Sequence, residues 1–165
     1  MITNKTLKIL LPSLALLMAA CERVEIRKER YPSGRLKARW EVTVSKDMEQ
    51  KNGVYEEWYE NKKSKLIVNY VDNKEHGVYR SYYPNSKIES EIYFIHGEMD
   101  GDFREWYDNG HRKREASYKK GKLHGTVQLW DSQGKHIAKA SFKNGECKNG
   151  DCEQIATTTA YRHNL

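Results

Sequence analysis

One pattern of glycine and aromatic residues returns every 24 residues along the chain. Its four complete copies begin at Gly53, Gly77, Gly101 and Gly125 and read GVYEEWYENK, GVYRSYYPNS, GDFREWYDNG and GTVQLWDSQG. A constant period of this length is typical of repeat proteins, in which one small unit packs on the next. The 165 residues are therefore expected to form one array of units that are too small to be stable alone.

Apolar and polar residues alternate with a period of two inside each unit. In the last complete unit, Ala138, Ala140 and Phe142 alternate with residues such as Lys139, and turn residues such as those at 108–110 separate the strands. This alternation is typical of strands with one buried and one solvated face. Each unit therefore reads as a β-hairpin, which cannot bury its large rings without a neighbour. We predict an all-β fold, an antiparallel meander of tandem 24-residue β-hairpin repeats.

The array is expected to extend beyond the four complete copies. A partial unit over residues 31–42 matches the second half of a repeat, and GDCEQI, from Gly150, resembles GDFREW and is expected to start another unit. Irregular units are common at the ends of repeat arrays, where they cap the stack. We therefore assign residues 31–152 to the array and residues 153–165, which lack clear periodicity, to a C-terminal tail.

The first 20 residues precede the array and read as a secretory signal peptide. Two lysines are followed by an apolar run that is short for a membrane span, and Ala19-Ala20 stands directly before Cys21. The sequence LMAAC resembles the bacterial lipoprotein signal, which implies cleavage before Cys21 and lipidation of its thiol. Because Glu22 follows the cysteine, the resemblance implies an outer-membrane anchor facing the periplasm, with residues 21–30 as a linker. Ordinary secretion, with Cys21 incidental, is the alternative.

Two further cysteines, Cys147 and Cys152, lie in CKNGDC near the C-terminus. Asn149-Gly150 is a strong signal for a two-residue hairpin turn, which would place the two cysteines opposite each other at a spacing that suits a disulfide. An exported protein meets an oxidising compartment, so we expect this disulfide to form. A metal site is the weaker interpretation, because no second pair of cysteine or histidine residues lies at ligand spacing.

Charge and motifs argue against nucleic-acid binding and catalysis. The net charge of +6 is small and spread along the chain, which indicates solvated strand faces; contact with anionic headgroups is the alternative. The sequence has no nucleophile elbow, P-loop or H-E-x-x-H motif. His76 and His124 both precede repeat glycines, which indicates a structural turn position rather than metal ligands or a general base. We expect no catalytic residue, metal or cofactor.

The repeat itself resembles a known family. GVYEEWYENKKS and GDFREWYDNGHRKREASYKKGKLHG, with the repeat glycines, are similar to the MORN repeat variant, which also occurs in bacterial proteins described as YwqK-type antitoxins of toxin–antitoxin systems. The resemblance covers residues 31–150 approximately. It implies an elongated sheet of hairpins that serves as a binding or scaffolding surface, with no catalytic residues to carry over. A lipidated, exported chain could not meet a cytoplasmic toxin, so a toxin partner would have to lie in the envelope.

The surface best suited to a partner is a row of large rings that share one position of the repeat. They are Trp58, Tyr82, Trp106 and Trp130. Rows of Tyr and Trp often bind proteins, whereas simple stacking along the sheet is the structural alternative. We expect a non-enzymatic envelope lipoprotein whose sheet binds a protein partner, with an envelope toxin as one candidate. A structural or membrane-surface module that binds lipid headgroups is the second possibility, and a hydrolase without a known motif is the third.

Overall fold

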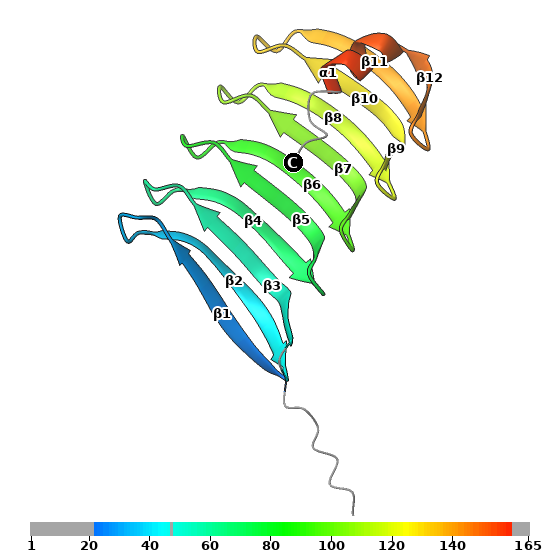
Figure 1. Ribbon diagram of the computed structural model, residues 1–165. Coiled ribbons are helices and arrows are strands. Elements are labelled where there is room, and N and C mark those ends of the chain that lie inside the picture. Colours follow the sequence, from blue (N-terminus) through cyan, green and yellow to red (C-terminus); the bar gives the residue numbers. More distant parts are fainter. Residues whose placement is uncertain (1–21, 47, 160–165) are drawn as a thin grey trace, which may run out of the picture.

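The computed structural model describes residues 22–46 and 48–159, which form one open antiparallel sheet with a short helix at its C-terminal end (Figure 1). Within these residues the sheet has twelve strands that follow one another in chain order, except that β10 and the two-residue β9 both pair with β8. The predicted all-β meander is therefore confirmed. The elements are β1 (Arg23–Arg30), β2 (Leu36–Ser45), β3 (Met48–Trp58), β4 (Ser64–Val71), β5 (Lys74–Tyr82), β6 (Ile88–Ile95), β7 (Glu98–Trp106), β8 (Arg112–Lys119), β9 (Lys122–Leu123), β10 (Gly125–Trp130), β11 (His136–Lys143), β12 (Glu146–Gly150) and α1 (Cys152–Thr159).

Two-residue turns close one end of the hairpins. They lie at 72–73, 96–97, 120–121 and 144–145. Both residues of each turn have positive φ, which is the geometry of the type I′ turn that matches the twist of antiparallel strands. The amide of the second residue in each turn also donates to a backbone carbonyl in the second strand of the preceding hairpin. For example, the amide of Gly121 donates to the carbonyl of Met99 at 2.8 Å. Neighbouring repeats are therefore joined at this end by more than strand pairing.

Longer turns close the opposite end, where tyrosine side chains join neighbouring turns. The hydroxyl group of each tyrosine donates to the backbone carbonyl of a residue that ends a strand in the next repeat. These bonds, which we call the tyrosine clamps, run from Tyr31 to Trp58 (2.8 Å), Tyr59 to Tyr82 (2.6 Å), Tyr83 to Trp106 (2.8 Å) and Tyr107 to Trp130 (2.9 Å). Asp131 replaces the tyrosine in the last repeat, and its carboxylate accepts amides of its own turn instead.

Removing one clamp should weaken the contact between two repeats. We expect Tyr107→Phe to lower the free energy of unfolding by about 0.5–1.5 kcal/mol, because a single neutral hydrogen bond to a carbonyl is lost. Urea unfolding followed by circular dichroism measures the change. Tyr93→Phe is the matched control, since Tyr93 is 41% exposed and its hydroxyl group makes no clamp. Equal effects of the two substitutions would contradict a structural role for the clamps.

One face of the sheet is apolar and carries the core. Phe103 of β7 lies between Ile92 of β6 and Ala116 of β8, and its ring packs against Tyr118. Burial is deepest towards β11, where Ala138 and Ala140 are buried and Lys139 between them is exposed. The predicted alternation is thus present in this strand. Further ring pairs on the face join Trp40 to Tyr55, Tyr55 to Tyr70 and Tyr79 to Phe94.

Half-buried tyrosines on this face should make the fold sensitive to alkali. Burial raises the pKa of Tyr70 to about 12, and the adjacent Glu75 carboxylate contributes to the rise. The unfolded chain loses this proton near pH 10, so between these values the folded state holds more protons than the unfolded state. The contribution of Tyr70 to the free energy of unfolding is therefore fully present below pH 10 and should be lost as the pH rises towards 12. Thermal unfolding across this range tests the prediction, and Tyr70→Phe should make the decline shallower.

The N-terminal boundary of the array differs from the prediction. The linker predicted for residues 21–30 is wrong for Arg23–Arg30, because these residues form β1 and pair with β2 along most of their length. The alternation RVEIR is compatible with a strand, and pairing with β2 satisfies backbone groups that would otherwise lie unpaired at the edge of that strand. Residues 1–20 and the predicted lipidation site Cys21 lie outside the described residues. Among the described residues, no helix is long and apolar enough to cross a membrane.

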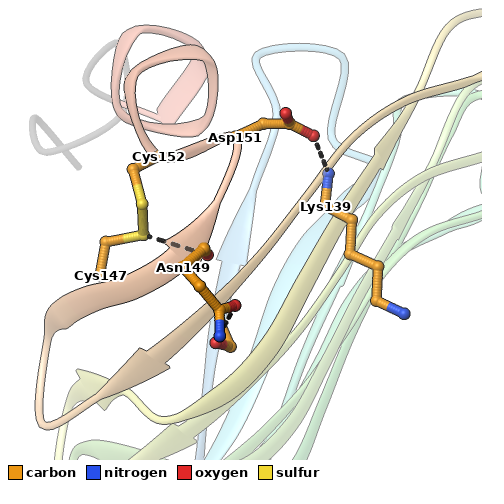
Figure 2. Close-up of a disulfide and its surroundings, with 6 residues drawn as sticks. Lys139, Cys147, Asn149, Asp151 and Cys152 are labelled. Atoms are coloured by element: carbon orange, nitrogen blue, oxygen red, sulfur yellow. Dashed lines mark hydrogen bonds between the residues drawn. A yellow bond between two sulfur atoms is a disulfide. The ribbon is translucent and has the colours of Figure 1, made fainter.

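The C-terminal boundary also differs. GDCEQI does not start a new hairpin, because β12 ends at Gly150 and α1 begins at Cys152, the last residue assigned to the array, and continues into the expected tail. Ile155 of α1 packs on the buried cluster that contains Ala138 and Ala140, so the helix covers the apolar face beside β11. Cys147 and Cys152 form the expected disulfide with a Cα–Cα distance of 6.0 Å, although they join a strand to a helix rather than two strands of a hairpin (Figure 2).

Candidate functional site

The candidate site is the aromatic row, which we define as Trp58, Tyr82, Trp106 and Trp130. Each member is the last residue of its strand, in β3, β5, β7 and β10 respectively. The register of strand pairing shifts directly before each of them, and a turn follows. The repeat therefore places one large ring per unit along the same end of the sheet. All four rings are half-buried, so each presents part of its surface to solvent.

The members of the aromatic row lie in a line with regular spacing. One strand stands between each pair of strands that carry them, so their backbones are about 9–10 Å apart across the sheet. The stacked ring pairs of the core lie in other positions of the repeat. Trp130 at the end of the row packs edge-on against His136, with ring centroids 5.6 Å apart. The sheet thus brings the four predicted residues into one row of separate rings rather than one continuous stack.

The tyrosine clamps hold the backbone of the aromatic row in place. Every member of the row has its own carbonyl bonded by the hydroxyl group of a clamp tyrosine from the preceding repeat. Burial raises the pKa of Tyr59 and Tyr107, in keeping with their position between turns. This role of the tyrosines was not predicted from the sequence. The signal was present, since a tyrosine follows Trp58, Tyr82 and Trp106 directly at the 24-residue period.

A shallow pocket lies beside the first ring of the row. Its lining consists of Trp58, Leu36 and the two basic residues Arg35 and Lys62, and its volume is about 260 Å³. The Arg35 guanidinium also donates to the carbonyl of Glu60 at 3.1 Å, which holds it near the turn. An apolar ring flanked by two cations suits an apolar group that carries a carboxylate.

A buried carboxylate lies directly before the third ring. Glu105 is only 3% exposed, and its two oxygen atoms lie 2.9 Å from Lys113 Nζ and 3.5 Å from Arg114 Nε. The Arg114 guanidinium in turn lies 4.2 Å from the centre of the Phe103 ring. The two cations offset the charge of this buried carboxylate, so we assign Glu105 a structural role.

The two repeat histidines differ in position, since His76 lies in a strand and His124 lies between β9 and β10. His76 lies inside β5 before Gly77, whose φ of 81° accompanies a shift in strand register, so the predicted turn position is wrong for this residue. Its ring packs edge-on against His96 with a centroid distance of 5.0 Å. Nδ1 of His76 and of His124 is buried without a hydrogen-bond partner among the described residues. In the same part of the chain, no group of three or more His, Cys, Asp or Glu residues could hold a metal ion.

The repeat unit matches a known family model. The model described as MORN repeat variant matches residues 51–72, 75–96, 99–120 and 123–144. These four matches cover more than half of the chain. The protein belongs to the MORN repeat variant family. A comparison with curated proteins gave no match. Each matched MORN unit ends at the first residue of a two-residue turn, and the next matched unit begins three residues after that position. The unit boundaries therefore coincide with the turns that join neighbouring hairpins.

Proposed function

We propose that this MORN array is a non-enzymatic protein-binding module and that the aromatic row is its contact surface. The observation that supports the proposal is the row itself, which presents four half-exposed rings at regular spacing. Trp and Tyr are enriched among the residues that contribute most to protein–protein binding. The clamps fix the backbone under every ring, so less conformational entropy is lost when a partner binds.

The same proposal places the module in the bacterial envelope as a lipoprotein anchored through Cys21. Its support is the signal-like sequence before Cys21 and the disulfide between Cys147 and Cys152, a bond typical of oxidising compartments. An antitoxin-like role, with an envelope toxin as the partner, is the most specific form of this function. The basic pocket beside Trp58 favours a partner that presents an acidic group next to an apolar one.

Crosslinking in living cells tests the proposal directly. A photoreactive residue is placed at Trp106, and the captured protein is identified and compared with the capture from the exposed position Lys139 on β11. The expected result is one protein at defined stoichiometry from Trp106 alone. Capture of the same abundant envelope components from both positions would show that the row is only structural.

A binding measurement with the captured protein provides the second test. The combined variant Tyr82→Ala and Trp106→Ala is expected to weaken binding by at least about 100-fold, because each central aromatic contact contributes about 2 kcal/mol or more. Val54→Ala combined with Val78→Ala is the control, since both side chains are exposed and lie outside the row. Unchanged affinity of the first variant would exclude the row as the contact surface.

A membrane-surface role is the second candidate, and the pair of cations beside Trp58 favours it. Basic and aromatic side chains together are typical of surfaces that contact anionic headgroups. This function predicts binding to vesicles that contain an anionic lipid, with loss of binding at high salt. Vesicle sedimentation with the purified chain distinguishes this function from protein binding, because no other protein is present. If the chain binds headgroups, it should sediment with the vesicles, and the combined variant Arg35→Ala and Lys62→Ala should not.

A further inference from the structure

The two edges of the sheet are finished in different ways. At the C-terminal edge, β12 is five residues long, is joined to α1 by the disulfide, and lies beside that helix (Figure 2). At the N-terminal edge, β1 is eight residues long, and no described residue pairs with its outer side. A long edge strand with unpaired backbone groups is a template for another strand. The N-terminal edge is therefore the one that can be extended.

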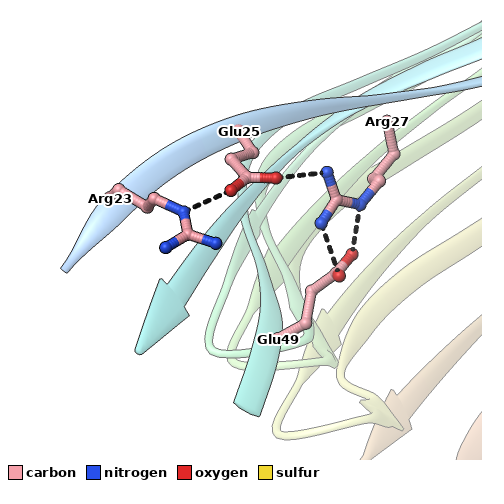
Figure 3. A network of polar contacts seen from close by, with 4 residues as sticks. All are labelled: Arg23, Glu25, Arg27 and Glu49. Atoms are coloured by element: carbon pink, nitrogen blue, oxygen red, sulfur yellow. Dashed lines mark hydrogen bonds and ion pairs between the residues drawn. The ribbon is translucent and has the colours of Figure 1, made fainter. Parts of the chain in front are cut away.

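The charges on one face of β1 alternate in sign. Arg23, Glu25, Arg27 and Glu29 lie on the face of the sheet that also carries Trp40, because Arg27 is directly opposite Trp40 in β2. Figure 3 shows the network that three of them form with Glu49 of β3: Glu25 accepts from both arginines, and Arg27 also donates to Glu49 at 2.8 and 2.9 Å. The side chains remain accessible, with exposed fractions from 31% for Glu25 to 67% for Arg23.

We propose that β1 pairs with β1 of a second copy of this chain, antiparallel, around a two-fold axis at Ile26. In this register Arg23 lies opposite Glu29 of the second copy, and Glu25 lies opposite Arg27. The symmetry repeats both pairs, so every charge on this face meets an opposite charge. Opposite charges directly across neighbouring strands stabilise a sheet, and like charges destabilise it.

The alternation fixes the register. If the second strand slides by two residues towards either end, Glu25 or Arg27 comes to lie opposite its own copy, and the neighbouring pairs also become pairs of like charge. A slide by one residue would place the opposite faces of the two sheets side by side, because side chains alternate along a strand. Pairing centred on Ile26 is the register that matches the faces and gives all four charged residues of each strand an opposite charge.

The other face of β1 agrees with the same register. Val24 and Ile26 lie there and are 69% and 52% exposed, so both leave apolar surface in solvent at the edge of the sheet. In the proposed dimer, Ile26 lies directly opposite Ile26 of the second copy, and Val24 lies opposite the aliphatic stem of Lys28. The contact therefore covers apolar surface on one face and pairs charges on the other, and the two arrays form one continuous sheet.

Cysteine crosslinking of the full-length chain tests the register. Directly opposite side chains have Cβ atoms about 5 Å apart, so Ile26→Cys is expected to give a disulfide-linked dimer under mild oxidation. Val24→Cys is the matched control on the same face. It should give no dimer, because two copies of this position would be about 13 Å apart along the strands. Val24→Cys combined with Lys28→Cys should restore the crosslink.

Three outcomes would overturn the proposal. They are a dimer yield for Ile26→Cys no greater than for Val24→Cys, a crosslinked dimer of the wild-type chain through Cys21 at the same yield, and covalent capture of a different protein at position 26. The last outcome would show that the edge receives a foreign strand instead.

Charge exchange provides an independent test by native mass spectrometry of the full-length chain. Glu25→Arg alone is expected to abolish the dimer, because two opposed pairs then carry like charges. Adding Arg27→Glu should restore the dimer, because every charge then again lies opposite an unlike charge of the second copy. It should do so although the charges no longer alternate within each strand. A dimer that is equally abundant in all three chains would contradict the proposed pairing, and thermal unfolding of each chain shows whether the sheet remains folded.

Discussion

Replacing Gly150 with alanine is expected to lower the free energy of unfolding by about 2–5 kcal/mol and to release α1 from the end of the sheet. Gly150 has a φ of +90°, which side chains rarely adopt, and a Cβ atom there would lie 2.3 Å from the carbonyl oxygen of Lys139 and 2.7 Å from Cα of Ala140. Both atoms belong to the backbone of β11, so neither can move aside without disturbing the sheet. The neighbouring bond from the amide of Asp151 to the Lys139 carbonyl, 3.0 Å long, should be lost as well.

Gly121→Ala is the matched control for this prediction. Gly121 also has positive φ, at +72°, but a Cβ atom there would meet nothing within 4 Å. Its substitution should cost only the backbone penalty of about 1–2 kcal/mol. Urea unfolding gives the two stabilities, and hydrogen exchange at the amide of Ile155, which bonds to the Asp151 carbonyl at 3.1 Å, reports on the helix. If both variants lose the same stability and the Ile155 amide stays protected, close contact at Gly150 does not hold the helix in place.

The interior of the array was predictable because its physical causes recur in the sequence. A period of two identifies a strand, and the 24-residue period shows where each ring lies relative to its copies, so Trp58 and Trp106 could be placed at one position of the sheet from the sequence alone. The clamps escaped prediction for a different reason. Tyr107 acts on the carbonyl of Trp130, 23 residues away, and only the packing of one turn on the next brings these groups together.

The ends of the array were predicted less well because end units lack the neighbour that determines the structure of an internal unit. GDCEQI resembles the start of a strand, but among the described residues no strand follows β12 to pair with it. The same residues instead gain stability by burying Ile155 on the open apolar face beside Ala140. Likewise, nothing in residues 21–30 repeats the 24-residue pattern, and the strand at Arg23–Arg30 follows from the free edge of β2.

Replacing Phe103 with alanine is expected to cost about 3–5 kcal/mol, the usual effect of removing a buried phenylalanine. Phe103 is 5% exposed and lies in the middle of the array, between Ile92 and Ala116. Its ring contacts Tyr118 and lies under the guanidinium of Arg114. The substitution therefore leaves a cavity in the contact between neighbouring repeats and removes the surface on which that guanidinium rests.

In a repeat protein such a cavity also affects cooperativity. Stability is carried by the units and by the contacts between neighbours, so a weak central contact should allow the repeats on its two sides to unfold separately. We expect urea unfolding of Phe103→Ala to become broader, with the C-terminal repeats, which hold the buried residues around Ala138 and Ala140, unfolding last. Ile95→Ala, which truncates a side chain that is 40% exposed in the adjacent strand β6, should cost less than about 1 kcal/mol and leave a single sharp transition. A single transition for Phe103→Ala with unchanged steepness would show that the sheet unfolds as one unit despite its repeats.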